Sequence, residues 1–141
     1  MKPMIYLFFK GDCLEAMTHY AAVLGGRIQG VLRNADAPAQ EFCMPGGGDM
    51  ILNMSMVLED NLVMASDNSE ETYRMPQGFR ISIEPDTLED FERVHASLAR
   101  EARTVEMEPC ETFWAERFAL FTDRYGTPWM LNYTGSKETR K

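Results

Sequence analysis

The chain has 141 residues, of which 45% are hydrophobic and 26% are charged. This suits one soluble globular domain, and no apolar run approaches the roughly 20 residues that span a bilayer. The formal net charge of −8 argues against nucleic acid and membranes as partners, because both surfaces repel an acidic protein. The start of the chain does not read as a signal peptide, so we expect a cytoplasmic protein.

The sequence contains an internal repeat, whose two copies lie 74 positions apart. Each copy begins with an apolar run, continues with Asp-x-x-Glu and ends in an amphipathic stretch. Asp12 and Glu15 in the first copy correspond to Asp86 and Glu89 in the second. The period is longer than that of solenoid repeats, so the pattern predicts two paired modules.

The first module is predicted to open with a strand at residues 4–9. A helix should follow at Asp12, whose side chain would cap it with Glu15 in a capping box, and Gly25-Gly26 should end it. Further strands are predicted at 27–33, 50–58 and 62–66. Between them, residues 34–49 carry two prolines and three consecutive glycines, a composition that predicts a mobile loop.

The second module repeats this order after a polar connector at residues 68–77. Its strands are predicted at 79–84, 103–107, 115–122 and 128–133, with a helix that Asp86 and Glu89 would cap. We therefore expect an α+β fold of two tandem βαβββ modules, with helices outside. The modules (1–67 and 78–134, with a tail at 135–141) should form a curved, mixed but mostly antiparallel sheet around a cleft.

Cysteine and histidine give little sign of a metal or redox site. Cys13, Cys43 and Cys110 are an odd number at wide spacing, which does not favour a disulfide framework or structural zinc. Cys13 would lie in the first turn of a helix, where the helix dipole can lower the pKa of a thiol. The alternative is a small, partly buried side chain. His19 and His95 both fall on predicted helices, as packing or surface residues do.

Several stretches carry a resemblance to a known family. They are Tyr6-Leu7-Phe8-Phe9, Val63-Met64-Ala65-Ser66-Asp67, Glu111-Thr112-Phe113-Trp114-Ala115, and the run from Thr122 through Asp123, Tyr125-Gly126 and Trp129 to Asn132. With the duplicated βαβββ pattern, the chain resembles the PhnB-like branch of the vicinal oxygen chelate superfamily. That superfamily includes glyoxalase I, extradiol dioxygenases and the fosfomycin and bleomycin resistance proteins. The resemblance covers nearly the whole chain and implies a homodimer.

The resemblance also shows where a metal would be expected. In the superfamily, His, Glu or Gln ligands lie on the first and last strands of each module, and such ligands suit a divalent cation. Matching the superfamily's first strand places one position at Ile5, and the repeat offset of 74 gives Phe79. Counting from Gly126 on the last strand gives Met130, and its partner in the first module is Met64. None is a usual ligand, and a shift of one residue in either direction supplies no set of histidine and carboxylate. We therefore expect no metal and no other cofactor.

The resemblance then predicts a cleft that binds a small hydrophobic or aromatic molecule. Its candidate lining residues are Ile5, Leu7, Asn53, Met64, Phe79, Trp114, Phe118 and Met130, with Tyr6, Arg80, Glu116, Arg117 and Asn132 as further polar candidates. Each apolar residue in this set could instead belong to the core. The Phe113-Trp114 pair could form a pocket rim, a plug or a dimer contact.

The alternative is an enzyme of the superfamily, a lyase, isomerase or transferase with an altered or non-metal site. Acid–base chemistry would then involve Glu116, Asp123, Tyr6 or Arg80, although no spacing among them compels it. A methyltransferase with a nucleoside cofactor would need a glycine-rich loop after a first parallel strand. The chain has only Gly11-Asp12 at that place.

Overall fold

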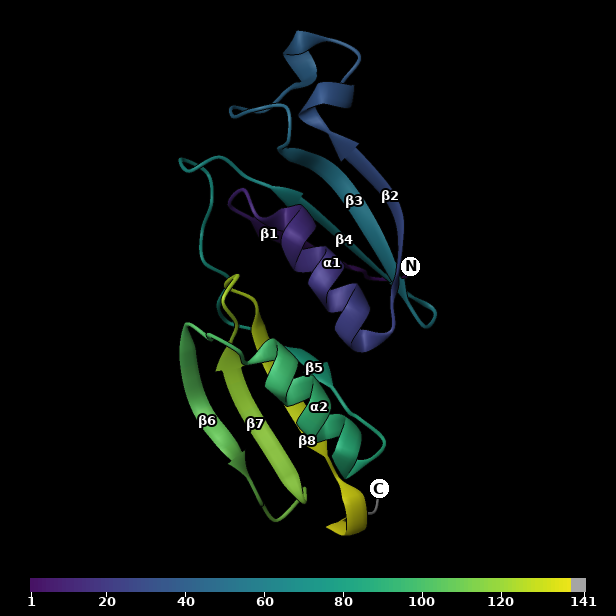
Figure 1. Ribbon diagram of the computed structural model, residues 1–141, viewed down its shortest axis with the longest axis vertical. Helices are drawn as coiled ribbons and strands as arrows, with labels where there is room; N and C mark the ends of the chain where they lie inside the picture. The colour runs from purple at the N-terminus through teal and green to yellow at the C-terminus, as the bar shows by residue number, and fades with distance from the viewer. Residues whose placement is uncertain (138–141) are drawn as a thin grey trace. The chain divides into compact units, whose positions relative to one another are not determined.

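The computed structural model describes residues 1–137 (Figure 1). The chain divides into two compact units, Met1–Arg74 and a second that begins at Met75, and their boundary falls in the segment expected to be the connector. Each unit has one helix and one four-stranded mixed sheet. The α+β fold of two βαβββ modules is thereby confirmed, with a separate sheet in each module.

Unit 1 follows the predicted order of elements. These are β1 (Ile5–Phe9), α1 (Cys13–Leu24), β2 (Arg27–Arg33), β3 (Ile51–Leu58) and β4 (Asn61–Asp67), with short 3-10 turns at Asn34–Asp36 and Gln40–Phe42. The strand order in the sheet is β1-β4-β3-β2. Strand β1 runs parallel to β4, whereas the β3–β4 and β2–β3 pairs are antiparallel.

Unit 2 repeats this topology. It contains β5 (Ile81–Ile83), α2 (Leu88–Leu98), β6 (Thr104–Cys110), β7 (Arg117–Thr122), β8 (Pro128–Tyr133) and a 3-10 turn at Gly135–Lys137. The strand order is β5-β8-β7-β6, with β5 parallel to β8. The bounds differ most at three strands: β5 and β7 begin two residues later than expected, and β6 continues three residues further, to Cys110. No helix within residues 1–137 is long and apolar enough to cross a membrane.

The core of each unit lies between its helix and one face of its sheet. In unit 1, Met17 and Tyr20 of α1 are buried with Leu7, Phe9 and Met54. In unit 2, the buried side chains of α2 are Phe91, Val94 and Leu98, and those of its sheet include Phe121, Trp129 and Leu131. Burying such side chains stabilises each unit by about 1.5–3 kcal/mol per residue.

The caps of both helices differ from those predicted. Asp12 makes no side-chain capping bond. Instead, the buried carboxylate of Asp67 at the end of β4 accepts from the backbone N–H groups of Gly11 (2.8 Å) and Cys13 (3.0 Å), and its other oxygen accepts from Ile51 (2.9 Å). This carboxylate comes from more than 50 residues away, so the local capping pattern could not reveal it.

Helix α2 is capped by Thr87, one residue after the predicted Asp86. The Thr87 hydroxyl accepts from the backbone N–H of Asp90 at 3.0 Å. Threonine is a good N-cap residue, and the shift of one position is within the usual spread of helix boundaries.

A second buried carboxylate organises the turn between β7 and β8. Asp123 accepts from the backbone N–H groups of Tyr125 and Thr127, both at 2.9 Å, and from the indole N–H of Trp129 at 2.8 Å. Asp123 and Trp129 are both buried. This network gives a structural reason for the motif from Thr122 to Trp129.

The segment expected to be a mobile loop is held together by one buried residue. Asn34 donates from its side chain to the carbonyls of Met44 (2.9 Å) and Gly47 (3.1 Å) and accepts from the N–H of Met44 (3.1 Å). Its own backbone N–H donates to Met50. Composition predicted only a mobile loop here. It does not show that the side-chain amide of Asn34 joins both ends of the loop.

Candidate functional site

Each sheet has one face packed against the helix of its own unit. We call the other face the open face. In β1, Leu7 and Phe9 are buried on the helix side, whereas Tyr6 and Phe8 are 41% and 46% exposed. Because side chains alternate along a strand, Leu7 is a core residue and Ile5 lies on the same side. Leu7 is thus part of the core and Ile5 is 38% exposed, whereas Tyr6 and Phe8 are the side chains of β1 on the open face.

The pairing of the parallel strands gives a second way to match positions between the two modules. Tyr6 lies opposite Met64 in the β1–β4 pair, and Ser82 lies opposite Met130 in the β5–β8 pair. With Met64 matched to Met130, Tyr6 matches Ser82 rather than Arg80, which an offset of 74 gives. Phe79 precedes β5 because the chain from Gly78 to Arg80 enters the strand two residues later than a uniform offset of 74 implies.

On the open face of unit 1, two predicted site residues lie beside Tyr6. Met64 is its strand partner, and the Asn53 side chain donates to the Tyr6 hydroxyl at 3.2 Å. The ring of Phe8 lies 5.1 Å from that of Tyr6. This cluster presents an aromatic surface with one polar pair.

In unit 2, the structure brings two other predicted residues into one cavity. The cavity has a volume of about 500 Å³ and is lined by Pro76, Gln77, Gly78, Phe79, Arg80, Glu106, Thr122, Pro128 and Met130. Phe79 is 49% exposed. We call this cavity the Phe79 pocket. It has an apolar wall and a small set of polar groups, which is the usual make-up of a small-molecule site.

The polar side of the Phe79 pocket is an ion pair between Arg80 and Glu106. We call it the braced ion pair because further hydrogen bonds hold both side chains. Arg80 donates from Nη1 to the carbonyls of Phe121 (3.2 Å) and Trp129 (3.1 Å), and its Nη2 lies 3.6 Å from the Glu106 carboxylate. The other carboxylate oxygen of Glu106 accepts from the hydroxyls of Thr104 (2.7 Å) and Thr122 (3.2 Å).

These contacts also decide the charge of Glu106. Partial burial raises the pKa of its carboxyl, but the hydrogen bonds from Thr104 and Thr122 and the charge of Arg80 outweigh burial and lower that pKa overall. Glu106 is thus ionised at neutral pH, and the charged side chains of the pocket balance each other. Sequence reasoning missed Glu106, because nothing local indicates that an exposed strand residue pairs with Arg80.

Trp114 and Phe118 form a separate aromatic cluster in unit 2. Their rings meet edge to face at 5.1 Å, and Phe113 contacts Trp114 in the same way at 4.9 Å. Phe118 is buried, whereas Phe113 is 83% exposed. Trp114 therefore covers Phe118 within its own unit, and Phe113 is the ring that remains accessible.

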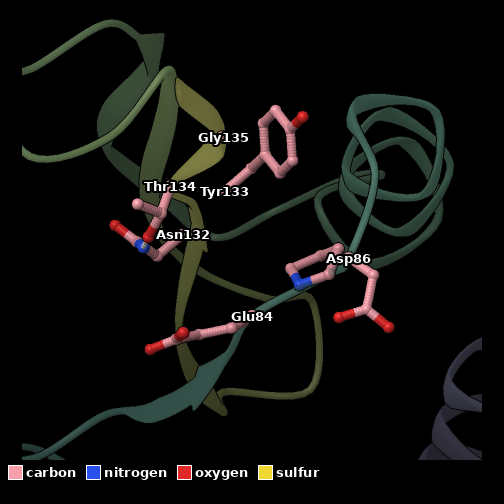
Figure 2. Close-up of a pocket in the computed structure, with 7 residues that line it drawn as sticks. Glu84, Asp86, Asn132, Tyr133, Thr134 and Gly135 are labelled. Atoms are coloured by element: carbon pink, nitrogen blue, oxygen red, sulfur yellow. Dashed lines mark hydrogen bonds between the residues drawn. The ribbon is translucent and has the colours of Figure 1, made fainter. Parts of the chain in front are cut away.

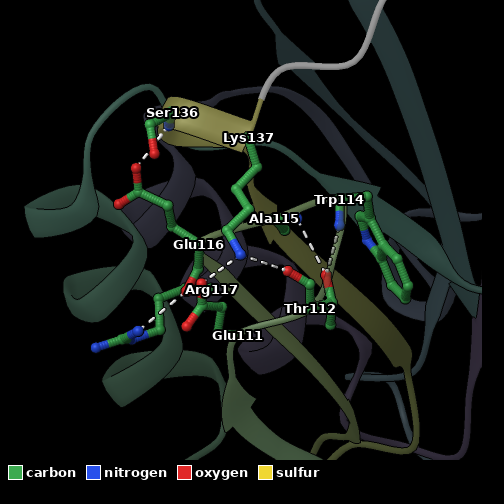
Figure 3. A network of polar contacts seen from close by, with 8 residues as sticks. All are labelled: Glu111, Thr112, Trp114, Ala115, Glu116, Arg117, Ser136 and Lys137. Carbon is green, nitrogen blue, oxygen red and sulfur yellow. Dashed lines mark hydrogen bonds and ion pairs between the residues drawn. The ribbon is translucent and has the colours of Figure 1, made fainter.

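The loop that carries Trp114 is fastened to the last turn of the described chain (Figure 3). Lys137 forms an ion pair with Glu111 and donates to the carbonyl of Thr112 at 3.1 Å. The Thr112 hydroxyl accepts from the backbone N–H groups of Trp114 and Ala115. These bonds set the position of the aromatic cluster.

Two residues considered for acid–base chemistry have structural roles instead. Glu116 accepts from the backbone N–H of Ser136 at 2.6 Å (Figure 3), and this hydrogen bond lowers the pKa of its carboxyl. Asp123 holds the buried turn before β8.

Cys13 is buried, and burial together with the charges of Asp67 and Asp12 raises the pKa of its thiol. Of the two alternatives for Cys13, a reactive thiol or a small buried side chain, the structure therefore favours the second.

A second cavity of about 400 Å³ lies at the end of β8 (Figure 2). It is lined by Glu84, Pro85, Asp86, Asn132, Tyr133, Thr134 and Gly135. Its lining is mostly polar, in contrast to the Phe79 pocket. Asn132 donates from its side-chain nitrogen to the Thr134 hydroxyl at 3.0 Å.

Comparison with known proteins identifies the family. Residues 1–132 match the family model described as 3-demethylubiquinone-9 3-methyltransferase. The chain belongs to this family. The crystal structure of protein PA1353 from Pseudomonas aeruginosa is 34% identical, with a TM-score of 0.81, and the match covers 94% of this chain and 97% of that one.

Two more distant structures show the fold. The putative 3-demethylubiquinone-9 3-methyltransferase, PhnB protein, from Bacillus cereus is 21% identical with a TM-score of 0.81, covering 94% of this chain and 99% of that one. The fosfomycin resistance protein FosX from Mesorhizobium loti is 16% identical with a TM-score of 0.58, covering 96% and 92%. The family match and these two likenesses agree with the resemblance to the PhnB-like branch of the vicinal oxygen chelate superfamily, whose fold the chain shares.

Tyr6, Met64, Ser82 and Met130 do not form a set of side chains that suits a divalent cation. Tyr6 pairs with Met64, and Ser82 pairs with Met130, across the parallel strands of the two sheets. Thioethers are poor ligands for hard or borderline cations. Within residues 1–137, no group of three His, Cys, Asp or Glu side chains is arranged to hold a metal.

Proposed function

We propose that this protein binds a small molecule with an apolar or aromatic body in the Phe79 pocket. The observation that carries the proposal is the joining of Phe79 and Met130 with Arg80 and Glu106 around one cavity of about 500 Å³. Methionine adapts to varied ligand shapes, and the half-exposed ring of Phe79 offers a surface for stacking.

The braced ion pair supports selection of polar groups on that ligand. Arg80 is anchored to two backbone carbonyls, so its guanidinium keeps its position when a ligand enters. Because Glu106 neutralises it, the pocket would favour an uncharged or singly polar group beside Arg80 over a second strong anion. The ligand expected is thus a small aromatic molecule with a hydrogen-bonding substituent.

We further propose that binding proceeds without a metal, since the residues at the metal positions are poor ligands. Enzymatic turnover is the second candidate. It is disfavoured because Glu116 and Asp123 are engaged in structural hydrogen bonds. The description of the family suggests methyl transfer. However, the helix terminus after β1, where a nucleotide-binding fold holds its cofactor, is already occupied by the Asp67 carboxylate.

We also propose that the protein is cytoplasmic and forms a homodimer. Tyr6 and Phe8 on β1, and Val105 and Met107 on β6, are each at least 37% exposed. Neighbouring exposed apolar side chains on one strand often mark contacts between chains. Light scattering on the purified protein should give twice the chain mass of 16.1 kDa. A monomer at micromolar concentration would contradict this part of the proposal.

Binding is tested by titrating 3-phenylpropanol into the protein and following backbone amide resonances. We expect shifts at residues of the Phe79 pocket and about tenfold weaker binding by Phe79→Ala, the effect of losing roughly 50 Å² of apolar contact. Phe113→Ala removes an exposed ring outside the pocket and is the matched control. If both variants bind as the wild type does, or if no pocket resonance moves, the proposed site is wrong.

Catalysis and metal binding are tested on the same preparation. We expect no stoichiometric manganese, zinc, nickel or iron by elemental analysis, and no transfer of labelled methyl from S-adenosylmethionine to a demethylubiquinone. A stoichiometric metal at Met64 or Met130 would contradict the metal-free proposal. Methyl transfer abolished by a change in the Phe79 pocket would favour the enzyme.

A further inference from the structure

The open face of unit 2 ends in polar side chains next to the cavity at the end of β8. We propose that Asn132 and Glu84 form a subsite for a hydrogen-bond donor on the ligand, and that a primary ammonium group suits it best. This inference rests on the proposed function, because the ligand body would lie over Met130.

The first observation is an acceptor without a donor. The side-chain oxygen of Asn132 is buried and has no hydrogen-bond partner within residues 1–137, while its nitrogen already donates to Thr134. Buried polar atoms are nearly always paired in native proteins, and leaving one unpaired costs free energy. A ligand N–H or O–H placed in this cavity would remove that cost.

The second observation is the nature of the neighbouring groups. Glu84 follows β5 directly and is exposed, and as a carboxylate it can only accept hydrogen bonds. Figure 2 shows the side chains of Glu84, Asn132 and Thr134 on one side of the end of β8, with Asp86 and Tyr133 on the other. Two acceptors on the same side call for a donor, and the charge of Glu84 favours a cationic one.

The third observation is continuity with the Phe79 pocket. Met130 and Asn132 lie two residues apart on β8 and share the open face, so their side chains are about 7 Å apart. Their partners on β7 are Leu120 and Phe118. An apolar body over Met130 and Leu120 would place a substituent of a few atoms at Asn132. The net charge of −8 also attracts cations to the surface.

The test compares three ligands that share one apolar body, 3-phenylpropylamine, 3-phenylpropanol and 3-phenylpropanoate, by calorimetric titration into the full chain. We expect the amine to bind most tightly and the carboxylate least. Glu84→Gln should weaken the amine by about tenfold, the usual effect of losing a charge-assisted hydrogen bond, and leave the alcohol unchanged. Glu92→Gln, the same change on the exposed side of α2, is the control. Asn132→Leu should weaken both the amine and the alcohol.

The outcomes separate the two proposals. If the carboxylate binds most tightly, or if Glu84→Gln behaves as Glu92→Gln does, the donor subsite is overturned. The Phe79 pocket would still stand if Phe79→Ala weakened all three ligands. If none of the three binds, the proposed function fails and the subsite fails with it. Glu84 is on the surface, so its variant gives an answer even if Asn132→Leu does not fold.

Discussion

The buried carboxylate of Asp67 gives a sharp prediction about stability. It accepts from three backbone N–H groups, those of Gly11, Cys13 and Ile51, at 2.8–3.0 Å, and joins the start of α1 and the start of β3 to the end of β4. Asp67→Asn keeps the shape of the side chain. It removes the charge and turns an N–H donor toward one of the three backbone donors.

The magnitude follows from these contacts. One buried donor left unpaired costs about 1–3 kcal/mol, and weaker bonds to a neutral amide add to this, so the free energy of unfolding should fall by about 3 kcal/mol. With a urea m-value of roughly 2 kcal/mol per molar, the midpoint should fall by about 1.5 M.

Urea denaturation followed by circular dichroism measures this change, and amide exchange locates it. We expect faster exchange at Gly11, Cys13 and Ile51. Asp60→Asn, the same substitution in the exposed turn between β3 and β4, is the control and should change the midpoint little. A stability for Asp67→Asn within about 0.5 kcal/mol of that control would refute the reasoning, because surface substitutions of no consequence fall in that range.

Three further predictions concern unit 2. Asp123→Asn should shift the fluorescence of Trp129 and lower stability, because the indole N–H loses a charged acceptor; an unchanged emission spectrum would contradict this. Burial lowers the pKa of His95 from 6.5, although the charge of Glu108 opposes the shift. As the pH falls, His95 therefore becomes protonated in the unfolded chain before it does so in the folded one. The stability that neutral His95 contributes is complete above about pH 6.5 and falls as the pH drops toward the lower pKa of the folded state. His95→Gln should flatten the dependence of the urea midpoint on pH between 7 and 5, and an unchanged slope would exclude His95 as its source. Lys137→Ala removes the ion pair to Glu111 and the bond to Thr112, and should increase the exposure of Trp114 to acrylamide quenching; equal quenching of variant and wild type would show that this clamp does not position the ring.

The sequence alone predicted the order of elements and the duplication. Apolar periodicity, turn residues and the repeated Asp-x-x-Glu pattern are local signals, so they locate helices and strands to within a few residues. The resemblance to the superfamily, together with the repeat, then led to Phe79 and Met130, which the structure places around one cavity. Local signals do not show which side chains of β1 face the helix, and the structure places Leu7 there and Tyr6 on the open face.

Tertiary structure decided the features that depend on residues far apart in the chain. The cap of α1 comes from Asp67, the partner of Arg80 is Glu106, and Asn34 closes a loop that composition alone described as mobile. In each case a charged or polar group finds its partner only when strands pair or a loop closes. Local pattern can show that such a group must be satisfied, but the partner is set by the packing of the whole unit. This is why the sequence supplied the framework, while the charges and hydrogen bonds of the candidate site had to come from the fold.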